Sequence, residues 1–146
     1  RSGVIVDVGT VIYGSRGETF NAAHRLYNNQ GSAEQNENVF GKCSNKNWHG
    51  HNYVLFITVK GEPDPETGFI INVKELSQII KEVVVDKLDH TNLNLDVAFI
   101  PANIHPTTEN LAKIIWQQLE PHIKGCQLHS IKLQETENIY AEYFGE

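Results

Sequence analysis

The stretch "HNYVLFITVKG", residues 51–61, decides how this chain folds. Apolar and polar residues alternate along it, and it is rich in β-branched and aromatic types, so it predicts a β-strand. Upstream, "VIVDVGTVIY" (residues 4–13) and "ETFNAAH" (residues 18–24) have a similar composition. They predict extended strand, broken near Gly14 and Gly17. Strands therefore dominate the first part of the chain.

The segments on either side of residues 51–61 are polar. "NNQGSAEQNENVFGK", residues 28–42, contains glycine and few apolar residues, which predicts a loop. After residue 61, the turn sequence "EPDPETG" leads to "FIIN", residues 69–72, which predicts a short strand.

Two helices are predicted in the second half of the chain. In "NVKELSQIIKEVVVDKLD", residues 72–89, Asn72 can cap the helix start, with Glu75 three residues on. The apolar face of that helix would consist of Val73, Leu76, Ile79, Ile80 and Val83. In "PTTENLAKIIWQQLEPH", residues 106–122, Thr107 or Thr108 can serve as the cap. The apolar stripe there would consist of Leu111, Ile114, Ile115 and Leu119.

The end of the chain, "LHSIKLQETENIYAEYF" (residues 128–144), predicts two strands joined at residues 135–138. The order of elements is therefore strands, helix, helix, strands. That order predicts an α+β fold, with two helices packed on one face of a mainly antiparallel sheet. The edges of such a sheet could need a partner subunit.

Composition narrows the class of protein. The chain has 146 residues, of which 40% are hydrophobic, so we expect a single domain, residues 1–146, with its own core. A formal charge of −6 argues against a general nucleic-acid or anionic-membrane binder, because such partners require a dense basic face. No run of apolar residues approaches a membrane span, and two cysteines do not make a disulfide framework. We expect a soluble, cytoplasmic protein.

Three histidines form a candidate metal site. Residues two apart on a strand project to the same side, so His49 and His51 can aim at one point. His24 shares a face of the preceding strand with Phe20 and Ala22, and it would join them if the two strands pair. Three neutral nitrogens with one position left open are typical of a catalytic zinc site. The alternative is that these histidines are surface or hydrogen-bonded residues without a metal.

Other candidates lie close to this cluster or downstream of it. Cys43, in a polar loop near the candidate metal site, is either a reactive thiolate or an inert small residue. Asp89 and His90 have the carboxylate and imidazole of a base relay, although Asp89 could simply cap the following turn. Glu135 could bind a ring that presents adjacent N–H groups, or it could be a solvated turn residue.

Taken in order, these segments resemble one family. The motifs are "FNAAHRL", "FGKC", "HGHNY", "GEPDPETGFIINVKEL", "LDHTNLN", "PTTEN" and "QETENIY". They resemble the 6-pyruvoyl tetrahydropterin synthase family from about Glu18 to the C-terminus, which is most of the chain. The resemblance implies a tunnelling fold (T-fold), a four-stranded antiparallel sheet with two helices packed on one face. It also implies a homohexamer, in which three subunits join their sheets into a barrel and two trimers stack.

The resemblance assigns roles residue by residue. His24, His49 and His51 would be ligands of a zinc ion. Cys43 would be the general base, with Asp89 and His90 completing its relay from a neighbouring subunit. Glu135 would anchor the pterin ring. Thr107 and Thr108 would line the pterin pocket, with Glu109 as a weaker candidate.

The implied reaction is a lyase step of tetrahydrobiopterin biosynthesis. It converts 7,8-dihydroneopterin triphosphate to 6-pyruvoyl tetrahydropterin and eliminates triphosphate, with internal redox and no external hydride carrier. Zinc would act as a Lewis acid on the substrate's hydroxyl oxygens, while Cys43, with a pKa lowered by the metal and an imidazole, removes a proton. Arg25, beside His24, and Lys42, beside Cys43, are hypotheses for the triphosphate contacts.

Two departures and two alternatives accompany this interpretation. Trp48 stands where the family commonly has glycine, and residues 1–17 are longer and more apolar than expected. One alternative function is a 6-carboxytetrahydropterin synthase of the deazapurine (queuosine) pathway, which shares the zinc, the cysteine and the Asp-His pair. The other is a non-catalytic pterin- or metal-binding module, against which the joint presence of Cys43, Asp89 and His90 argues.

Overall fold

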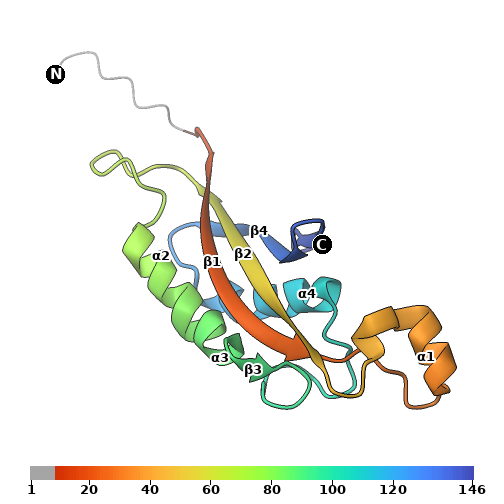
Figure 1. Cartoon of the computed structure of the whole chain (residues 1–146). Helices are drawn as coiled ribbons and strands as arrows, with labels where there is room; N and C mark the ends of the chain where they lie inside the picture. The colour runs from red at the N-terminus through yellow and green to blue at the C-terminus, as the bar shows by residue number, and fades with distance from the viewer. Residues whose placement is uncertain (1–8) are drawn as a thin grey trace, which may run out of the picture.

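A twisted five-stranded sheet forms the centre of the molecule (Figure 1). The computed structural model describes residues 9–146, and the strand order is β3-β1-β2-β4-β5. The four longer strands pair antiparallel, and they are β1 (Ile12–His24), β2 (His49–Gly61), β4 (Gln127–Thr136) and β5 (Ile139–Tyr143). The fifth, β3 (Thr91–Asn92), pairs parallel with β1. The predicted α+β class is confirmed, and a short parallel strand extends the predicted four-stranded sheet.

Strand β1 is continuous, so the predicted break near Gly14 and Gly17 is wrong. It pairs with β2 along its whole length, from Ile12 opposite Gly61 to His24 opposite His49. The glycine at 17 serves close packing instead, because a Cβ there would lie 3.2 Å from the ring of Phe56. The predicted upstream strand also included residues 4–8, which lie outside the described residues.

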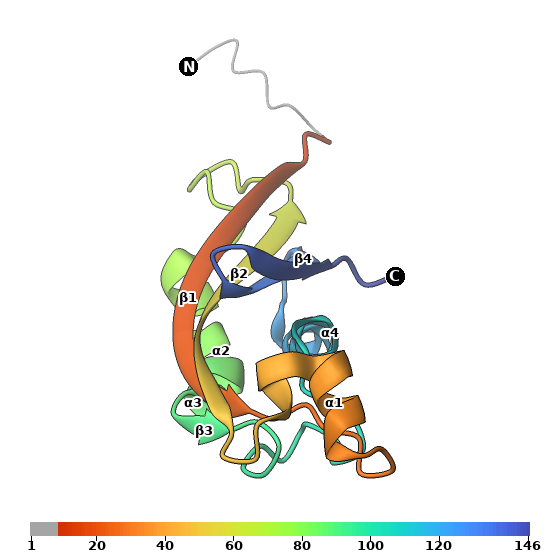
Figure 2. The ribbon, with the colours of Figure 1, turned by 45° about the vertical axis from the view of Figure 1, so that its right-hand side comes forward.

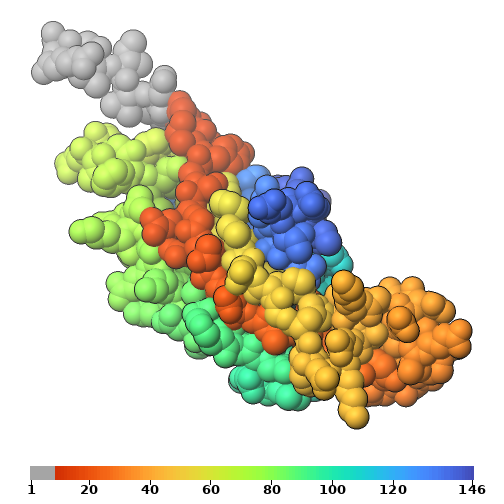
Figure 3. Space-filling view, viewed as in Figure 1, coloured from red at the N-terminus to blue at the C-terminus, as the bar shows by residue number. Residues whose placement is uncertain are grey.

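The segment predicted as a loop contains a helix, α1 (Ala33–Phe40), and then a 3-10 turn, η1 (Gly41–Ser44). Ser32 and Gln35 form a capping box: the Ser32 side chain accepts from the Gln35 N–H, and the Gln35 side chain accepts from the Ser32 N–H. The capping box stabilises the helix start, so the segment is helical although its polar composition predicted a loop. In the space-filling view, α1 and the residues leading into β2 lie together at one end of the molecule (Figure 3).

The first predicted helix is present, although the short strand predicted at residues 69–72 is not. It consists of α2 (Val73–Ile80), a π-helical segment η2 (Lys81–Val85) and α3 (Asp86–Leu88). Asn72 caps it as predicted, accepting from the N–H groups of Lys74 and Glu75.

The apolar face of this helix differs from the prediction at both ends. Val73 is 51% exposed, whereas Leu76 and Ile80 are buried. Beyond them, the π turn inserts an extra residue and rotates the buried face, so Val84 rather than Val83 is fully buried.

The second predicted helix is α4 (Thr108–Leu119), followed by a 3-10 turn, η3 (Glu120–His122). Its predicted apolar stripe is confirmed, because Leu111, Ile114, Ile115 and Leu119 are all buried. Both helices pack on one side of the curved sheet, whose core positions include Leu55, Ile57, Ile131 and Leu133 (Figure 2). None of the described helices has the length and apolar character needed to cross a membrane.

Candidate metal and active site

Three histidine rings meet where β1 ends and β2 begins. The antiparallel register places His24 directly opposite His49, and His51 lies two residues further along the same face of β2. The His24 ring centroid lies 4.4 Å from that of His49 and 5.0 Å from that of His51, and the other two rings are 4.8 Å apart. The two strands therefore pair, as is required for His24 to join His49 and His51.

His24 is held as a neutral imidazole with one unprotonated nitrogen. Its side chain is fully buried, and its Nδ1–H donates to the backbone carbonyl of Pro106 at 2.9 Å. A carbonyl can only accept, so the proton is on Nδ1 and the lone pair is on Nε2. Burial lowers the pKa of His24 to about 4, and the nearby His49 and His51 act in the same direction. At neutral pH its Nε2 is therefore unprotonated.

Glu135, at the end of β4, completes this cluster. Its Oε1 lies 3.4 Å from Nε2 of His24 and 3.3 Å from Nε2 of His51. Although so close to the carboxylate, Nε2 of His51 is a buried atom without a hydrogen bond in the described part of the chain. The lone pair on the unprotonated Nε2 of His24 thus faces a carboxylate oxygen, which is unfavourable unless a cation lies between them.

Two overlapping sets of side chains have ligand atoms close enough to hold a metal ion. In each set, all ligand atoms lie within 4.8 Å of one another. One set is His24, Cys43 and His49, and the other is His24, His51 and Glu135. His24 is common to both, and its unprotonated Nε2 is 2.8 Å from Nε2 of His49. The residues present therefore fit a metal ion.

Cys43 reaches the cluster from the turn η1. Its backbone carbonyl accepts the N–H of Leu26 at 2.7 Å, which ties η1 to the residues just after β1. Burial and the charge of Glu135 raise the pKa of the half-buried thiol. Without a neighbouring positive charge the sulfur is therefore a thiol, and the predicted lowering of its pKa requires the metal.

Asp89 and His90 form a carboxylate–imidazole pair just after α3. Nδ1 of His90 lies 2.9 Å from Oδ2 of Asp89, and the other carboxylate oxygen accepts the N–H of Asn21 at 2.8 Å. These N–H donors, with Asn21 first, lower the pKa of Asp89. The His90 side chain is 81% exposed, and no hydrogen bond in residues 9–146 joins it to Cys43. It shares a surface hollow of about 410 Å³ with His51.

Thr107 and Thr108 begin α4, next to the carbonyl that fixes His24. The Thr107 side chain accepts from the Asn110 N–H at 3.2 Å, which caps the helix, and Thr108 is 3% exposed. The structure gives both threonines a structural role in the helix start. Their contact with a pterin stays a prediction.

Tyr53 belongs to the site but was missed by the sequence argument. It lies two residues after His51 on the same face, is fully buried, and stacks on Phe20 with ring centroids 4.9 Å apart. Its hydroxyl has no hydrogen-bond partner among the described residues. Burial, and then the charges of Glu135 and Cys43, raise its pKa. The two-residue spacing from His49 through His51 was the signal that could have identified it.

Trp48 adopts a backbone conformation that favours glycine. Its φ is +67°, in the left-handed region, and its N–H donates to the carbonyl of Asn45 at 3.1 Å. This geometry gives a physical reason for a glycine at this position. The chain has tryptophan directly before His49 and still makes the turn.

Comparisons with a family model and with individual proteins agree with one another. The family model described as 6-pyruvoyl tetrahydropterin synthase matches residues 13–146. The chain is 46% identical over 132 residues to the 6-pyruvoyl tetrahydrobiopterin synthase of Dictyostelium discoideum, covering 90% of this chain and 95% of that protein. It is 45% identical over 132 residues to the enzyme of the same name from Pongo abelii, covering 90% of each chain.

A solved structure has the same fold. The 6-pyruvoyl tetrahydropterin synthase of Caenorhabditis elegans superimposes with a TM-score of 0.85 at 33% identity, covering 94% of this chain and 97% of that one. The arrangement of sheet and helices described above is therefore the arrangement found in that synthase.

Proposed function

The chain belongs to the 6-pyruvoyl tetrahydropterin synthase family, and on that premise we propose that it converts 7,8-dihydroneopterin triphosphate to 6-pyruvoyl tetrahydropterin with release of triphosphate. Such an enzyme is a lyase of tetrahydrobiopterin biosynthesis. The observation that carries the proposal is the single cluster formed by His24, Cys43, His49, His51 and Glu135. It combines candidate metal ligands, a proton acceptor and a carboxylate.

We propose that His24, His49 and His51 hold a zinc ion. The support is the fixed tautomer of His24, which leaves Nε2 unprotonated, and the buried Nε2 of His51, which has no hydrogen-bond partner among residues 9–146. When bound, zinc supplies a Lewis acid that polarises the hydroxyl groups of the substrate side chain.

Cys43 is the proposed base of the reaction. Its Sγ takes a proton from the substrate side chain, and loss of the triphosphate group then accompanies rearrangement of the resulting enediol. Because carbon centres of the substrate are oxidised and reduced within one molecule, no hydride carrier is consumed. Glu135 accepts the adjacent N–H groups of the pterin ring, and Thr107 and Thr108 line the ring's pocket.

Asp89 and His90 are proposed to relay the proton from a neighbouring subunit. Asp89 orients His90 through the 2.9 Å contact, and the exposed imidazole is available to a second copy of the chain. A homohexamer built as a dimer of trimers would supply that copy and pair the edge strands of each sheet.

The test is to incubate the zinc-loaded protein anaerobically with 7,8-dihydroneopterin triphosphate and to identify the products by mass spectrometry. Triphosphate, together with a pterin that retains all three side-chain carbons, is the expected result. Acetaldehyde with a carboxylated pterin would instead establish the 6-carboxytetrahydropterin synthase reaction. Unchanged substrate would indicate a binding module.

A further inference from the structure

A basic hollow of about 870 Å³ lies beside the candidate active site, at the end of the molecule that carries α1. Its volume falls in the range of small-molecule sites, about 300–1,000 Å³. Three of its lining residues are cations, Arg25, Lys42 and Lys46, and one is an anion, Glu37. In a chain of net charge −6, this local excess of positive charge is unusual.

Arg25 is positioned by several contacts. Asn94 holds both of its backbone groups: its Oδ1 accepts the Arg25 N–H, and its Nδ2 donates to the Arg25 carbonyl, each at 2.9 Å. The guanidinium lies 4.0 Å from the ring centroid of Tyr27, and its Nε donates to the carbonyl of Ser44 at 3.0 Å. Within residues 9–146 the terminal nitrogens of this guanidinium make no hydrogen bond or ion pair, so they are available to a ligand.

The two lysines are also available. Lys42 and Lys46 are exposed, and neither takes part in an ion pair in the part of the chain that the structure describes. Both come from the segment that carries Cys43, since Lys42 directly precedes it. The positive charges and the proposed base are thus held on one short piece of backbone, which the Leu26 to Cys43 hydrogen bond fixes to the end of β1.

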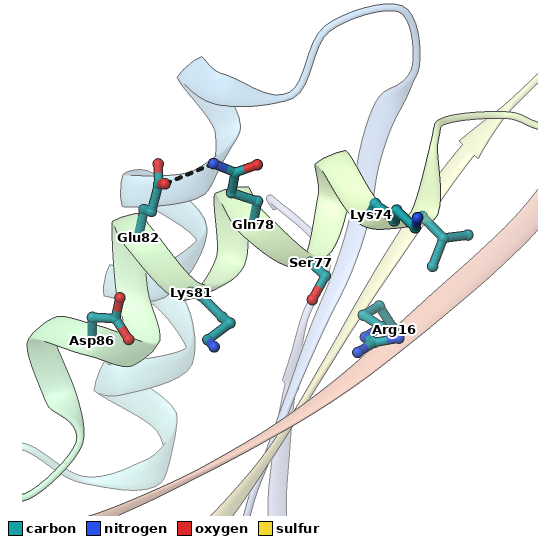
Figure 4. A pocket seen from close by; sticks show the side chains of 8 residues that line it. Arg16, Lys74, Ser77, Gln78, Lys81, Glu82 and Asp86 are labelled. Carbon is teal, nitrogen blue, oxygen red and sulfur yellow. Dashed lines mark hydrogen bonds between the residues drawn. The ribbon is translucent and has the colours of Figure 1, made fainter.

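A second hollow also contains three cations, but carboxylates accompany them. It lies along α2 (Figure 4), and its cations are Arg16, Lys74 and Lys81. There, however, Glu82 and Asp86 line the same hollow, and Nε of Arg16 donates to Glu18 at 3.1 Å. Three nearby carboxylates offset its three cations, and none of its lining residues is a chain neighbour of a residue in the metal cluster, whereas Arg25 and Lys42 adjoin His24 and Cys43.

We propose that Arg25, Lys42 and Lys46 bind the triphosphate arm of the substrate while the pterin lies at the metal cluster. The inference rests on the proposed function for the identity of the ligand. A triphosphate carries several negative charges, and phosphate oxygens form strong charge-assisted hydrogen bonds with guanidinium and ammonium groups. The shared segment explains how binding of the arm would place the side chain against Cys43.

The test compares two ligands that differ only in the triphosphate, measured on the zinc-loaded Cys43→Ala protein so that no turnover occurs. The ligands are 7,8-dihydroneopterin triphosphate and 7,8-dihydroneopterin, and the measurement is Kd by calorimetry. On that background the variant is Lys42→Ala/Lys46→Ala, and the control is Lys74→Ala/Lys81→Ala, which removes two positive charges from the other hollow. Arg25 is left intact because its stacking also supports the local fold.

We expect the Lys42→Ala/Lys46→Ala variant to raise the Kd of the triphosphate ligand roughly tenfold or more. The Kd of 7,8-dihydroneopterin should not change, and Lys74→Ala/Lys81→Ala should leave both values as they were. Glu37→Gln should tighten binding of the triphosphate ligand alone, because it removes the anion from the hollow. The effects should weaken as salt rises.

The proposal is overturned if the triphosphate ligand binds the Lys42→Ala/Lys46→Ala variant as tightly as it binds the Lys74→Ala/Lys81→Ala variant. It is also overturned if both ligands lose affinity equally, because the lysines would then act on the pterin end or on folding. Its failure is distinct from failure of the proposed function. Absence of triphosphate release by the wild-type chain would refute the reaction while leaving the lysine-dependent Kd difference, and hence the anion site, intact.

Discussion

Replacing Tyr53 by phenylalanine should stabilise the metal-free protein. The side chain is fully buried and its hydroxyl has no hydrogen-bond partner among the described residues. An unsatisfied buried polar group costs about 1–3 kcal/mol. The substitution removes only the oxygen and keeps the ring that stacks on Phe20. We expect the free energy of unfolding to rise by about 1 kcal/mol, which corresponds to an increase in Tm of about 2–4 °C for a chain of this length.

The assay is thermal and urea unfolding of both proteins after chelation, at matched protein concentrations because oligomerisation also shifts Tm. Tyr140→Phe is the control, since the same oxygen is removed from a tyrosine that is 54% exposed. That control should change stability by less than about 0.5 kcal/mol. A fall in the free energy of unfolding of about 1 kcal/mol or more in Tyr53→Phe would refute the reasoning. A loss of that size is typical of a removed hydrogen bond, so the hydroxyl would be hydrogen-bonded in the folded protein.

Three further outcomes are expected. Asn36→Ala removes the three hydrogen bonds by which this buried side chain joins Asn28 and Ser32, so the free energy of opening α1 should fall by about 2 kcal/mol in amide hydrogen exchange; unchanged exchange would contradict this. In the metal-free protein, the folded-state pKa of His24 (about 4) lies below its ordinary value of 6.5. The contribution of His24 to the free energy of unfolding, about 3 kcal/mol, should be complete above pH 6.5 and lost as pH falls towards 4. Urea unfolding across this pH range measures the dependence, which His24→Gln should lack. Cys43→Ala should lose most turnover yet retain one zinc per chain by elemental analysis, and retention of full activity would remove Cys43 from the mechanism.

The proposed role of Cys43 as a base requires a thiolate, which the metal-free cluster disfavours. Burial and Glu135 raise the pKa of the thiol, whereas a base must lose its proton. A divalent ion beside the sulfur would reverse the local electrostatics, since it both attracts the thiolate and offsets the carboxylate. The same residues that fit a metal therefore also need one for the proposed function.

Local sequence patterns determined much of the fold. Alternation along residues 51–61 identified β2, and the apolar repeat with a threonine cap identified α4, because the period of the apolar residues and the capping residue lie within the element itself. The spacing of His49 and His51 placed both on one face for the same reason. The helix at Ala33–Phe40 also has a local sequence signal, the Ser32 and Gln35 capping box. It was not predicted because the polar composition of residues 28–42 is typical of a loop.

Only the tertiary structure decided what these elements bring together. The register of β1 on β2 places His24 against His49, and Pro106, just before the N-cap of α4, supplies the carbonyl that fixes the His24 tautomer across 82 residues of sequence. The orphan hydroxyl of Tyr53 and the basic hollow around Arg25 likewise depend on contacts between distant segments. Sequence periodicity reports which face of an element is buried, whereas protonation, the partner of a polar atom and the sign of a cavity's charge are set by whatever packs against that face.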